Sequence, residues 1–400
     1  MPEPFEAVLY RVELPMAVGF DHPARRRSRS DSLVLRLDVD GVSGIGECAP
    51  RPYVTGETTD SVTAALYGVP LDDIVARLRH GDPAELLAGL RRDGVAGTFG
   101  VTGGNNLLCL LETTLLDLLG KLLRLGGQEL VPAGPRPAAL PSSLPVSQVL
   151  DLRLDVEEFL AERGPFHFVK IKASSDPARD VRAVARIRAH VGDRVPIMVD
   201  ANMSWSPEEA AGHVRALLDA GLTLVEEPLA RGAWDALARL RTATGVRIML
   251  DESVRTLDDA RRAVEHGACD AFNVRVAKNG GPVGAARIAG LARREGLAFQ
   301  VGVQVAEVGP LINAGRALAF RNADALTVEA GQSDRFFPDM IVSPRPAVCR
   351  ATNTLTPAPG HGFGVELNAL ADRWATGRRT GGDPSWTRVA RPASRTEELV

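Results

Sequence analysis

The sequence has little cysteine, and its few cysteines are widely scattered. Four occur in 400 residues, namely Cys48, Cys109, Cys269 and Cys349. No two of them are spaced as a Cys-x-x-Cys pair, so the chain offers neither a zinc-site spacing nor the dense cysteine framework of a small secreted domain. We therefore expect free thiols in a reducing compartment.

The sequence also lacks a long hydrophobic run and an excess of charge of one sign. Its most apolar stretch, residues 107–125, is interrupted by four charged residues and falls short of the roughly 18 apolar residues that a membrane span needs. The formal net charge is −3, which gives no electrostatic basis for binding nucleic acid or an anionic membrane. The first residues do not read as a signal peptide. These absences predict a cytoplasmic enzyme with a small-molecule substrate.

What the sequence does have is a series of short apolar runs that end in charged residues at a regular interval. The runs are Phe168–Lys172, Val195–Asp200, Leu222–Glu226, Val246–Asp251 and Phe272–Lys278. Their terminal charges lie 25 to 28 residues apart. A buried parallel strand with its crossover helix and two loops needs about that length. The intervals therefore predict parallel strands with helices between them, at residues 207–219, 233–242 and 257–266.

Further runs complete a closed β/α barrel over residues 131–330. Residues 298–305 and 325–329 are predicted to be its seventh and eighth strands, and the first strand is expected within the proline-rich residues 132–145. In such a barrel the loops that leave the carboxyl ends of the strands form the catalytic face. The five charges that end the runs should therefore converge on one cavity.

Residues 1–130 are predicted to form a separate α+β capping domain. Apolar and polar residues alternate at 8–14 and 32–39, which is typical of antiparallel strands with one wet face. Between them the arginine-rich residues 19–30 are either a solvated surface loop or a mobile lid over an anionic substrate. We expect residues 331–370 to complete this domain, and residues 371–400 to be a polar tail that runs over the surface or is disordered.

The charges at the strand ends suggest a specific chemistry. Asp200, Glu226 and Asp251 lie on three consecutive strands and form an all-oxygen trio suited to Mg²⁺. Lys170 and Lys172 are two residues apart on one strand, so they point to the same face. If that face is the barrel interior, burial and mutual repulsion lower a lysine pKa towards the range of a base. Lys278 is expected to face Lys172 across the cavity.

A divalent cation between two lysine bases suits the removal of a proton next to a carboxylate. The cation stabilises the enolate, while one lysine takes the α-proton and the other returns a proton or assists the loss or addition of a β-substituent. Taken singly, an acid at a strand end is more often a helix cap, and only the joint pattern argues for a site. Two rival hypotheses remain, a Schiff-base aldolase that uses Lys172 or Lys278 as nucleophile and a binding protein without catalysis.

Several short motifs occur together around these positions. In the barrel they are Lys170-Ile-Lys172, Val199-Asp-Ala-Asn202, Val225-Glu-Glu-Pro228, Leu250-Asp-Glu-Ser253 and Lys278-Asn-Gly-Gly281. Outside it they are Gly46-Glu-Cys-Ala-Pro50, Thr55-Gly-Glu-Thr58, Leu116-Asp-Leu-Leu-Gly-Lys121 and Pro359-Gly-His-Gly-Phe-Gly-Val-Glu366. As a set they resemble the enolase superfamily, and within it the subgroup of muconate-lactonising enzyme.

That resemblance implies a fold and a set of roles. The fold is an α+β capping domain over a modified TIM barrel of the (β/α)7β type. The implied ligands of Mg²⁺, for which Mn²⁺ is an alternative, are Asp200, Glu226 and Asp251. Lys172 and Lys278 are the implied acid/base pair, with Lys170 tuning Lys172. Like other members, the protein is expected to be a homo-oligomer that acts on a small carboxylate substrate.

The resemblance narrows the reaction but leaves alternatives open. No histidine occurs at residues 304–307, which points away from the mandelate-racemase branch. The remaining reactions are racemisation or epimerisation of an N-substituted amino acid or dipeptide, muconate-type cycloisomerisation, and an o-succinylbenzoate synthase-like dehydration. Similarity to N-acyl amino acid racemases and dipeptide epimerases favours the first. The expected substrate-binding residues are Phe20, Thr55, Asn202, Glu307 and Arg335, although Glu307 could equally make a structural pairing.

Overall fold

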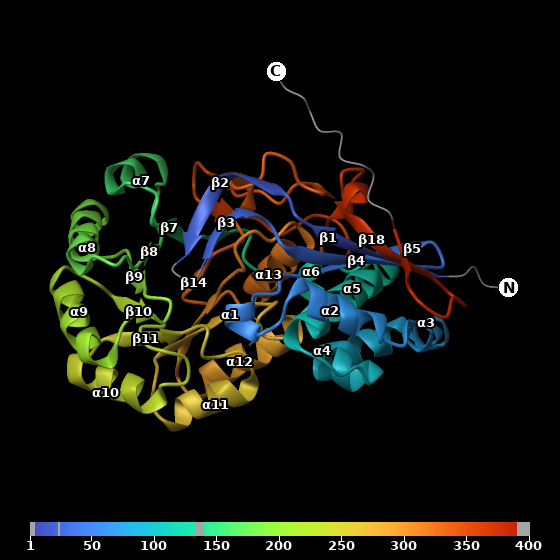
Figure 1. The fold of residues 1–400 in the computed structure, drawn as a ribbon, viewed down its shortest axis with the longest axis horizontal. Helices are drawn as coiled ribbons and strands as arrows, with labels where there is room; N and C mark the ends of the chain where they lie inside the picture. The colour runs from blue at the N-terminus through green and yellow to red at the C-terminus, as the bar shows by residue number, and fades with distance from the viewer. Residues whose placement is uncertain (1–4, 23–24, 133–139, 390–400) are drawn as a thin grey trace, which may run out of the picture.

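The computed structural model describes residues 5–22, 25–132 and 140–389, without the side chains of residues 20–22, 25 and 26. Figure 1 shows two parts side by side, a β/α barrel formed by the middle of the chain and a second part formed by both ends. The first and last labelled strands, β1 and β18, lie together in the second part, far from the helices α7 to α10. The parallel barrel and the sheet-rich part beside it agree with the predicted fold class.

The barrel contains one parallel sheet whose strands lie in chain order. Its strands are β7 (Gln148–Leu150), β8 (Val169–Lys172), β9 (Ile197–Asp200), β10 (Leu224–Glu226), β11 (Arg247–Leu250), β12 (Ala271–Val274), β13 (Ala298–Val301) and β14 (Thr327–Val328). The helices between them are α7 (Val156–Glu162), α8 (Pro177–Val191), α9 (Pro207–Asp219), α10 (Trp234–Thr244), α11 (Leu257–Glu265), α12 (Pro282–Arg294) and α13 (Pro310–Arg321). This alternation confirms the predicted (β/α)7β architecture.

A backbone hydrogen bond joins the two ends of the sheet. Ser147 N, just before β7, donates to Val328 O of β14 at 2.9 Å. The predicted first strand was wrong in position, because the strand that begins the barrel is β7 at residues 148–150. Leu144–Pro145, where that strand was expected to end, instead forms β6 and pairs with β16 (Thr354–Leu355). A proline lacks the amide that a central strand must donate, so this residue pair suits a short edge ladder.

Side chains inside the barrel lie in two layers. The lower layer is apolar and packs Phe168, Met198, Leu224, Met249 and Ala271 together. Because side chains on a strand alternate between faces, the residues two positions later point to the same interior. Those residues form a polar layer at the carboxyl ends of the strands. The apolar floor thus fixes the depth at which the charged groups sit.

The capping domain is built around a five-stranded antiparallel sheet. In order across the sheet, its strands are β19 (Thr387–Arg388), β18 (Ala375–Thr380), β1 (Glu6–Val12), β4 (Ser32–Val39) and β5 (Val42–Cys48). Helices α2 (Thr59–Tyr67), α3 (Leu71–His80), α4 (Pro83–Phe99) and α5 (Asn105–Leu123) follow. Helix α5 packs directly on β5, since a Cβ at Gly44 or Gly46 would lie within about 2.5 Å of Thr114.

Shorter elements connect the two parts. They are α1 (Pro52–Thr55), α6 (Gly127–Leu130), the 3₁₀ turns η1 (Ser333–Arg335) and η2 (Ala371–Trp374), and the pair β15 (Val342–Ser343) and β17 (Glu366–Leu367). The turn-rich residues 357–364 return to the capping domain as predicted. Gly362 N donates to Leu125 O at 2.9 Å, and Phe363 N donates to Asp117 Oδ1 at 2.7 Å.

The predicted tail from residue 371 was wrong over its described part. Residues 375–380 form β18, which pairs with β1 in the middle of the capping sheet, and Figure 1 shows this late strand lying beside the first ones. The segment has few large apolar side chains, and an ion pair between Arg379 and Asp72 and a stacked pair of rings add to its pairing with β1. Residues 390–400 lie outside the described residues.

The stacked rings give a stability prediction. Trp386 lies 5.1 Å from Tyr67 between ring centroids, with the planes 22° apart. Trp386→Ala removes this contact from the outer edge of the sheet and is expected to lower the free energy of unfolding by about 1–2 kcal/mol. Urea denaturation measures it. Leu122→Ala, at an exposed position on α5, is the control and should change stability by less than about 0.5 kcal/mol.

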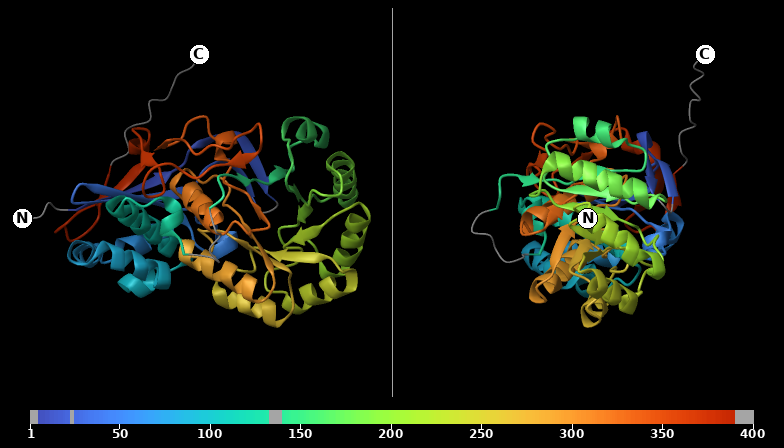
Figure 2. Two further views of the ribbon diagram at one scale, coloured as in Figure 1. Left: turned by 180° about the vertical axis from the view of Figure 1, so that it is seen from behind. Right: turned by 90° about the vertical axis from the view of Figure 1, so that its left-hand side faces the viewer.

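The arginine-rich segment near the start is a hairpin that reaches over the barrel. Strands β2 (Pro15–His22) and β3 (Arg25–Arg29) pair with each other, separately from the capping sheet. Figure 2 shows the hairpin extending from the capping domain along the barrel. Arg27 is buried and ion-paired with Asp31 at 2.8 Å. At Arg27, therefore, the segment is not a solvated loop.

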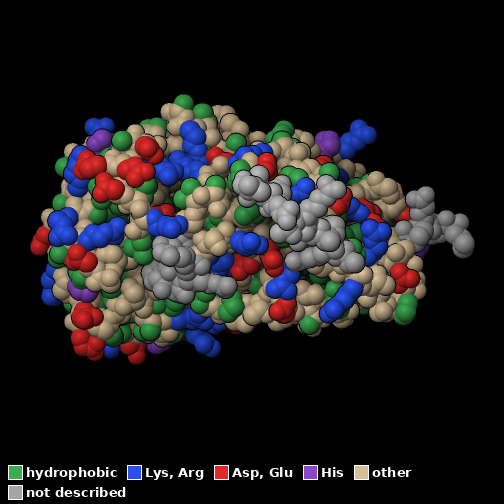
Figure 3. All heavy atoms as spheres, turned by 45° about the horizontal axis from the view of Figure 1, so that its top comes forward, with side chains coloured by type: hydrophobic (Ala, Val, Ile, Leu, Met, Phe, Trp, Pro, Cys, Tyr) green, Lys and Arg blue, Asp and Glu red, His purple; other side chains and the backbone are tan. Residues whose placement is uncertain are grey.

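The surface matches the balanced composition. On the face shown in Figure 3, acidic and basic side chains are interspersed, notably around the barrel helices. Among the described residues no helix has the length and apolar character needed to cross a membrane.

Candidate active site

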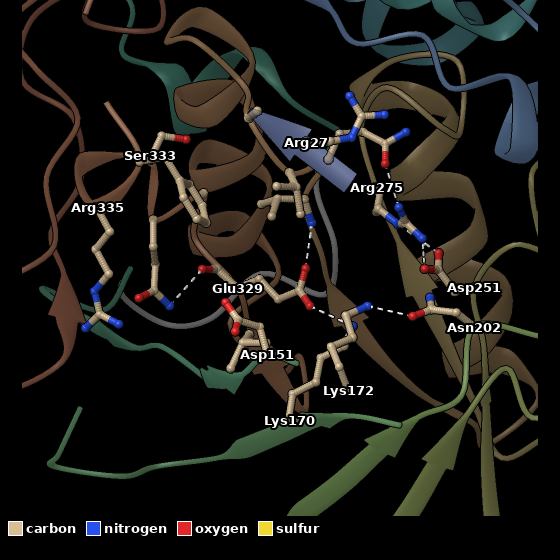
Figure 4. Close-up of a pocket in the computed structure, with 18 of the residues that line it drawn as sticks. Arg27, Asp151, Lys170, Lys172, Asn202, Asp251, Arg275, Glu329, Ser333 and Arg335 are labelled. Carbon is tan, nitrogen blue, oxygen red and sulfur yellow. Dashed lines mark hydrogen bonds and ion pairs between the residues drawn. The ribbon is translucent and has the colours of Figure 1, made fainter. Parts of the chain in front are cut away.

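A cavity of about 150 Å³ opens at the carboxyl ends of the barrel strands. Its walls come from nearly every part of the fold, namely the β2–β3 hairpin, α1, the strand ends of the barrel and the segment after β14. Figure 4 shows Lys170, Lys172, Asn202, Asp251 and Glu329 together in this region. Of the five strand-end charges predicted to converge, Lys172 and Asp251 line this cavity, whereas Asp200, Glu226 and Lys278 do not.

Lys170 and Lys172 point into the cavity from β8, as their spacing predicts. The Nζ of Lys172 donates to Asp200 Oδ2 at 2.7 Å and to Asn202 Oδ1 at 2.9 Å. The Nζ of Lys170 lies within 3.0 Å of three carboxylates, those of Asp200, Glu226 and Glu329. Lys170 is therefore held by anions on both sides of β8.

The predicted direction of the Lys170 pKa was wrong. Burial favours the neutral amine, but the carboxylates of Asp200, Glu226 and Glu329 outweigh it and raise the pKa of Lys170 well above its usual range. In turn, burial of Asp200 is outweighed by Lys170 and Lys172, which lower the pKa of that carboxyl. Lys170 is a fixed cation in this arrangement.

Lys278 lies behind Asp251 and does not reach the cavity wall in the described structure. Its side chain is fully buried, and Nζ donates to Asp251 O at 2.7 Å, to Asp251 Oδ1 at 2.8 Å and to Asn273 O at 2.6 Å. Burial, reinforced by the positive charge of Arg275, lowers the pKa of Lys278 well below its usual range. Lys278 is thus the lysine whose environment favours the neutral amine.

The three candidate metal ligands lie on neighbouring strands but are paired with cations. Lys170 bridges Asp200 and Glu226, while Asp251 contacts Arg275 and Lys278. In the described part of the chain, no three acidic, histidine or cysteine side chains are grouped as a metal site. The fit of these residues to a divalent cation is therefore judged from their charges and donor atoms.

The buried charges around this site do not balance. The buried carboxylates are Asp200, Glu226, Glu227, Asp251, Glu252 and Glu329, and the buried cations are Lys170, Lys172, Arg275 and Lys278. Burial raises the pKa of Glu227 to about 7, and burial together with neighbouring acids raises the pKa of Glu252 to about 8. Counted with every group ionised, two negative charges are left over on oxygen donors, and the raised pKa values of Glu227 and Glu252 are consistent with a site short of positive charge. This excess fits a divalent cation such as Mg²⁺.

Glu227 holds the loop that carries Asp251. Its carboxylate accepts from Asp251 N at 2.7 Å and from Ser253 N at 3.2 Å, and it also accepts from the Ser253 hydroxyl. The second acid of the Glu-Glu motif thus supports the first acid of the Asp-Glu motif. Glu252 similarly accepts from Asn202 Nδ2 at 3.1 Å, which orients the partner of Lys172.

Strained backbone gathers at these strand ends. Residues with φ between +39° and +72° follow β9, β10, β13 and β14, namely Asn202, Met203, Glu227, Ala306 and Ala330. Side chains other than glycine rarely adopt this left-handed region, and such residues cluster at functional sites.

The expected substrate-binding residues divide into two groups. Asn202 and Arg335 line the cavity. Glu307 does not, because it is buried behind the wall and accepts from Gln304 N at 2.7 Å, which is the structural pairing left open above. Thr55 also lies off the cavity and accepts from Asn106 Nδ2 at 3.0 Å. The side chain of Phe20 lies outside the described residues.

Sequence reasoning missed several cavity residues that a consistent rule would have found. Arg275 directly follows β12 and Glu329 directly follows β14, so both satisfy the strand-end rule that selected Asp200 and Glu226. Tyr53, in helix α1 two residues before Thr55, lines the cavity in its place. No sequence signal marked Tyr53, because its position depends on how α1 packs over the barrel.

The chain is similar to known proteins over most of its length. Residues 151–370 match the family model described as enolase C-terminal domain-like. The chain is 31% identical to muconate cycloisomerase 1 of Pseudomonas putida over 299 residues, which cover 70% of this chain and 74% of that protein. It is 27% identical to L-Ala-D/L-Glu epimerase of Bacillus subtilis (strain 168) over 299 residues, covering 74% and 79%.

Solved structures agree with the fold. The structure of an N-succinyl Arg/Lys racemase from Bacillus cereus ATCC 14579 superposes with a TM-score of 0.79 at 22% identity, covering 95% of this chain and all of that one. The muconate lactonizing enzyme from Pseudomonas putida gives a TM-score of 0.76 at 24% identity, covering 94% and 99%. At these sequence identities, the structural similarity establishes the fold alone.

Proposed function

The chain belongs to the enolase superfamily, and from that premise we propose that it is an isomerase that moves the α-proton of a carboxylate substrate, racemising or epimerising an N-substituted amino acid or dipeptide. The observation that carries this proposal is the placement of one lysine at the end of β8 and another on the turn after β12. Lys172 is held by Asp200, and Lys278 is held by Asp251. Two amines on separate segments are what proton transfer on two faces of one carbon requires.

In this proposal each lysine serves one face of the substrate. Lys172 stands on the cavity wall and can reach a bound substrate from β8. Lys278 can accept a proton, because its buried site favours the neutral amine. To reach the substrate, the amine of Lys278 must break its hydrogen bonds to Asp251 and to the Asn273 carbonyl, and it then accepts the α-proton. Lys170 stays charged and keeps the acids beside Lys172 in place.

The residues proposed to hold Mg²⁺, or Mn²⁺ in its place, are Asp200, Glu226 and Asp251. When bound, the cation supplies positive charge where negative charge develops on the substrate carboxylate. Asn273 donates to Glu226 Oε1 at 2.8 Å and Arg275 donates to Asp251 Oδ1 at 2.8 Å. These contacts orient the carboxylates from behind. The hairpin that carries Arg27 and the helix that carries Tyr53 restrict water from above.

Arg335 is proposed to bind the polar group at the far end of the substrate. It lies across the cavity from the lysines, on η1 (Figure 4). Burial, reinforced by the nearby charges of Arg350 and Arg163 and opposed by Asp334, lowers the pKa of Arg335 to about 9, so the guanidinium has other cations as neighbours. An acyl oxygen or a second carboxylate would pair with these cations.

This role predicts an effect on binding more than on chemistry. Arg335→Met keeps the apolar stem and should raise the KM about tenfold or more while kcat changes little, because the contact is the same in the ground and transition states. Steady-state kinetics on an accepted substrate measures both. Arg294→Met, on the exposed face of α12, is the control. A fall in kcat as large as the rise in KM in the Arg335→Met variant would contradict a binding role.

Muconate-type cycloisomerisation remains the second candidate, because the chain is 31% identical to muconate cycloisomerase 1. The two functions are separated by incubating the protein and Mg²⁺ with N-acyl amino acids, dipeptides, muconates and a precursor of o-succinylbenzoate. Chiral chromatography detects inversion, and ultraviolet absorbance detects loss of the muconate diene. Inversion supports the proposal, whereas turnover of only the muconate or the dehydration substrate replaces it.

A further inference from the structure

We propose that Asn105 of the capping domain is a positioning residue for Lys278, and that the loop of residues 55–57 acts through it. The inference rests on the proposed role of Lys278 as one of two proton-transfer groups. It gives the capping domain a part in proton transfer on one face of the substrate, in addition to covering the cavity.

Asn105 bonds to the backbone of the residue that carries the proposed base. Its Nδ2 donates to Lys278 O at 2.6 Å and to Arg255 O at 3.2 Å. These carbonyls belong to the loops that follow β12 and β11, the two loops whose side chains pair as Lys278 and Asp251. One side chain of the capping domain therefore ties together the two segments that form this ion pair.

The same face of α5 makes a second contact with the turn after Lys278. Glu112 follows Asn105 by seven residues, about two helical turns, and so lies on the same side of the helix. Its Oε1 accepts from Val283 N at 2.8 Å and its Oε2 from Val95 N at 3.2 Å. Gly281 has φ +113°, and a Cβ there would lie 2.4 Å from Glu112 Oε1. The turn between Lys278 and α12 is thus packed closely against α5.

The loop of residues 55–57 fixes where Asn105 stands. Helix α5 has no side-chain cap of its own, since its cap residue is Gly104. Glu57 supplies the missing acceptor, because its carboxylate accepts hydrogen bonds from Asn106 N at 3.1 Å and from Asn106 Nδ2 at 2.8 Å. Thr55 accepts from the same Nδ2 at 3.0 Å. An acid at a helix start satisfies free amides and the helix dipole, so this loop holds the first turn of α5.

The contacts of Asn105 matter for proton transfer because the side chain of Lys278 is buried and held in place. Its ammonium group is fully buried and its three contacts are to Asp251 and Asn273. A shift of the backbone at Lys278 moves Nζ relative to the substrate, while Lys172 on the far strand β8 is unaffected. Loss of Asn105 should therefore harm one half of the proton transfer and spare the other.

The test measures exchange of each substrate enantiomer separately in D₂O with Mg²⁺. The Lys278→Ala variant first identifies which enantiomer loses its α-proton to Lys278. In Asn105→Ala, exchange of that enantiomer should fall about ten- to hundredfold, the scale of a displacement near 1 Å, while exchange of its mirror image changes little. Asn105→Asp, of the same size but without the donor, should show the same asymmetry if Asn105→Ala does not fold.

Two further variants sharpen the result. Glu57→Gln should show a smaller loss in the same enantiomer, because it weakens the hold on α5 without removing Asn105. Asn322→Ala removes another buried asparagine that donates to a backbone carbonyl, Leu318 O at 2.8 Å, and should affect neither enantiomer selectively. Equal losses for both enantiomers in the Asn105 variants would overturn the positioning role and leave the two-lysine proposal intact. Absence of exchange in the parent protein would overturn the proposed function itself, and this inference with it.

Discussion

Replacing either Lys172 or Lys278 with alanine is expected to lower the rate of racemisation by about a thousandfold or more, which is the upper range for removal of an acid or base group. Inversion needs one group to take the proton and another to deliver it on the opposite face, so each lysine is indispensable. Each variant should nonetheless retain α-proton exchange of the enantiomer that the remaining lysine serves. Chiral chromatography measures inversion, and mass spectrometry in D₂O measures exchange.

Lys121→Ala is the matched control, because Lys121 also pairs with a carboxylate, Asp117 at 2.9 Å, but lies in α5 of the capping domain. Its turnover per folded molecule should equal that of the parent. Inversion at the parent rate in both cavity variants would show that the two lysines are not the proton-transfer pair. A Schiff-base role predicts a different outcome, a covalent adduct that borohydride traps at Lys172 or Lys278.

Removal of the divalent cation is expected to abolish turnover and to be reversed by added Mg²⁺. Without it, the formal excess of negative charge among the buried groups is left uncompensated, and the developing enolate loses the divalent cation proposed to stabilise it. Glu226→Gln should have the same effect, a loss of about a thousandfold together with weaker Mg²⁺ binding. Activity after EDTA treatment and calorimetric titration with Mg²⁺ measure the two effects.

Glu157→Gln provides the control for that substitution, since Glu157 is an exposed glutamate that pairs with Arg186 at 2.6 Å on the outer helices. It should bind Mg²⁺ like the parent. Full activity after thorough chelation would contradict the metal role of the trio. It would favour the aldolase hypothesis, which leaves Asp200, Glu226 and Asp251 without a function.

The positions of the barrel strands were readable because two constraints act on the same residues. A strand buried on both faces must be apolar along its length, and a catalytic charge can stand only where the strand ends. Both constraints mark Lys172, Asp200 and Glu226, and β8, β9 and β10 end at these residues. Lys278 departs from the rule, since β12 ends at Val274 and the lysine follows on a turn.

The direction of the lysine pKa shift was harder to predict from the sequence than the positions of the strand-end residues. The spacing of Lys170 and Lys172 predicted two repelling ammonium groups, but the repulsion is outweighed by carboxylates from other strands. Glu329, on the last strand, was not counted among the acids, and it lies 3.0 Å from Lys170. A pKa depends on every charge around a buried group, so a prediction from one strand alone lacks most of the terms.

The ends of the chain were misread because their structure depends on long-range contacts. Strand β18 reads as a polar segment, and its register is set by β1, more than 360 residues earlier. The Thr55-Gly-Glu motif suggested a substrate contact, whereas the structure uses Thr55 and Glu57 to hold the start of α5. Neither outcome follows from local propensity, since both depend on which distant backbone groups need partners.

The measurement that tests the account most directly is deuterium uptake from D₂O with Mg²⁺, followed by mass spectrometry across a panel of N-acyl amino acids, dipeptides and betaines. The account predicts uptake of one deuteron at the α-carbon of an accepted substrate, together with inversion at that carbon. Absence of uptake from every member of the panel, in protein shown by calorimetry to bind Mg²⁺, would contradict α-proton transfer on this class of substrate.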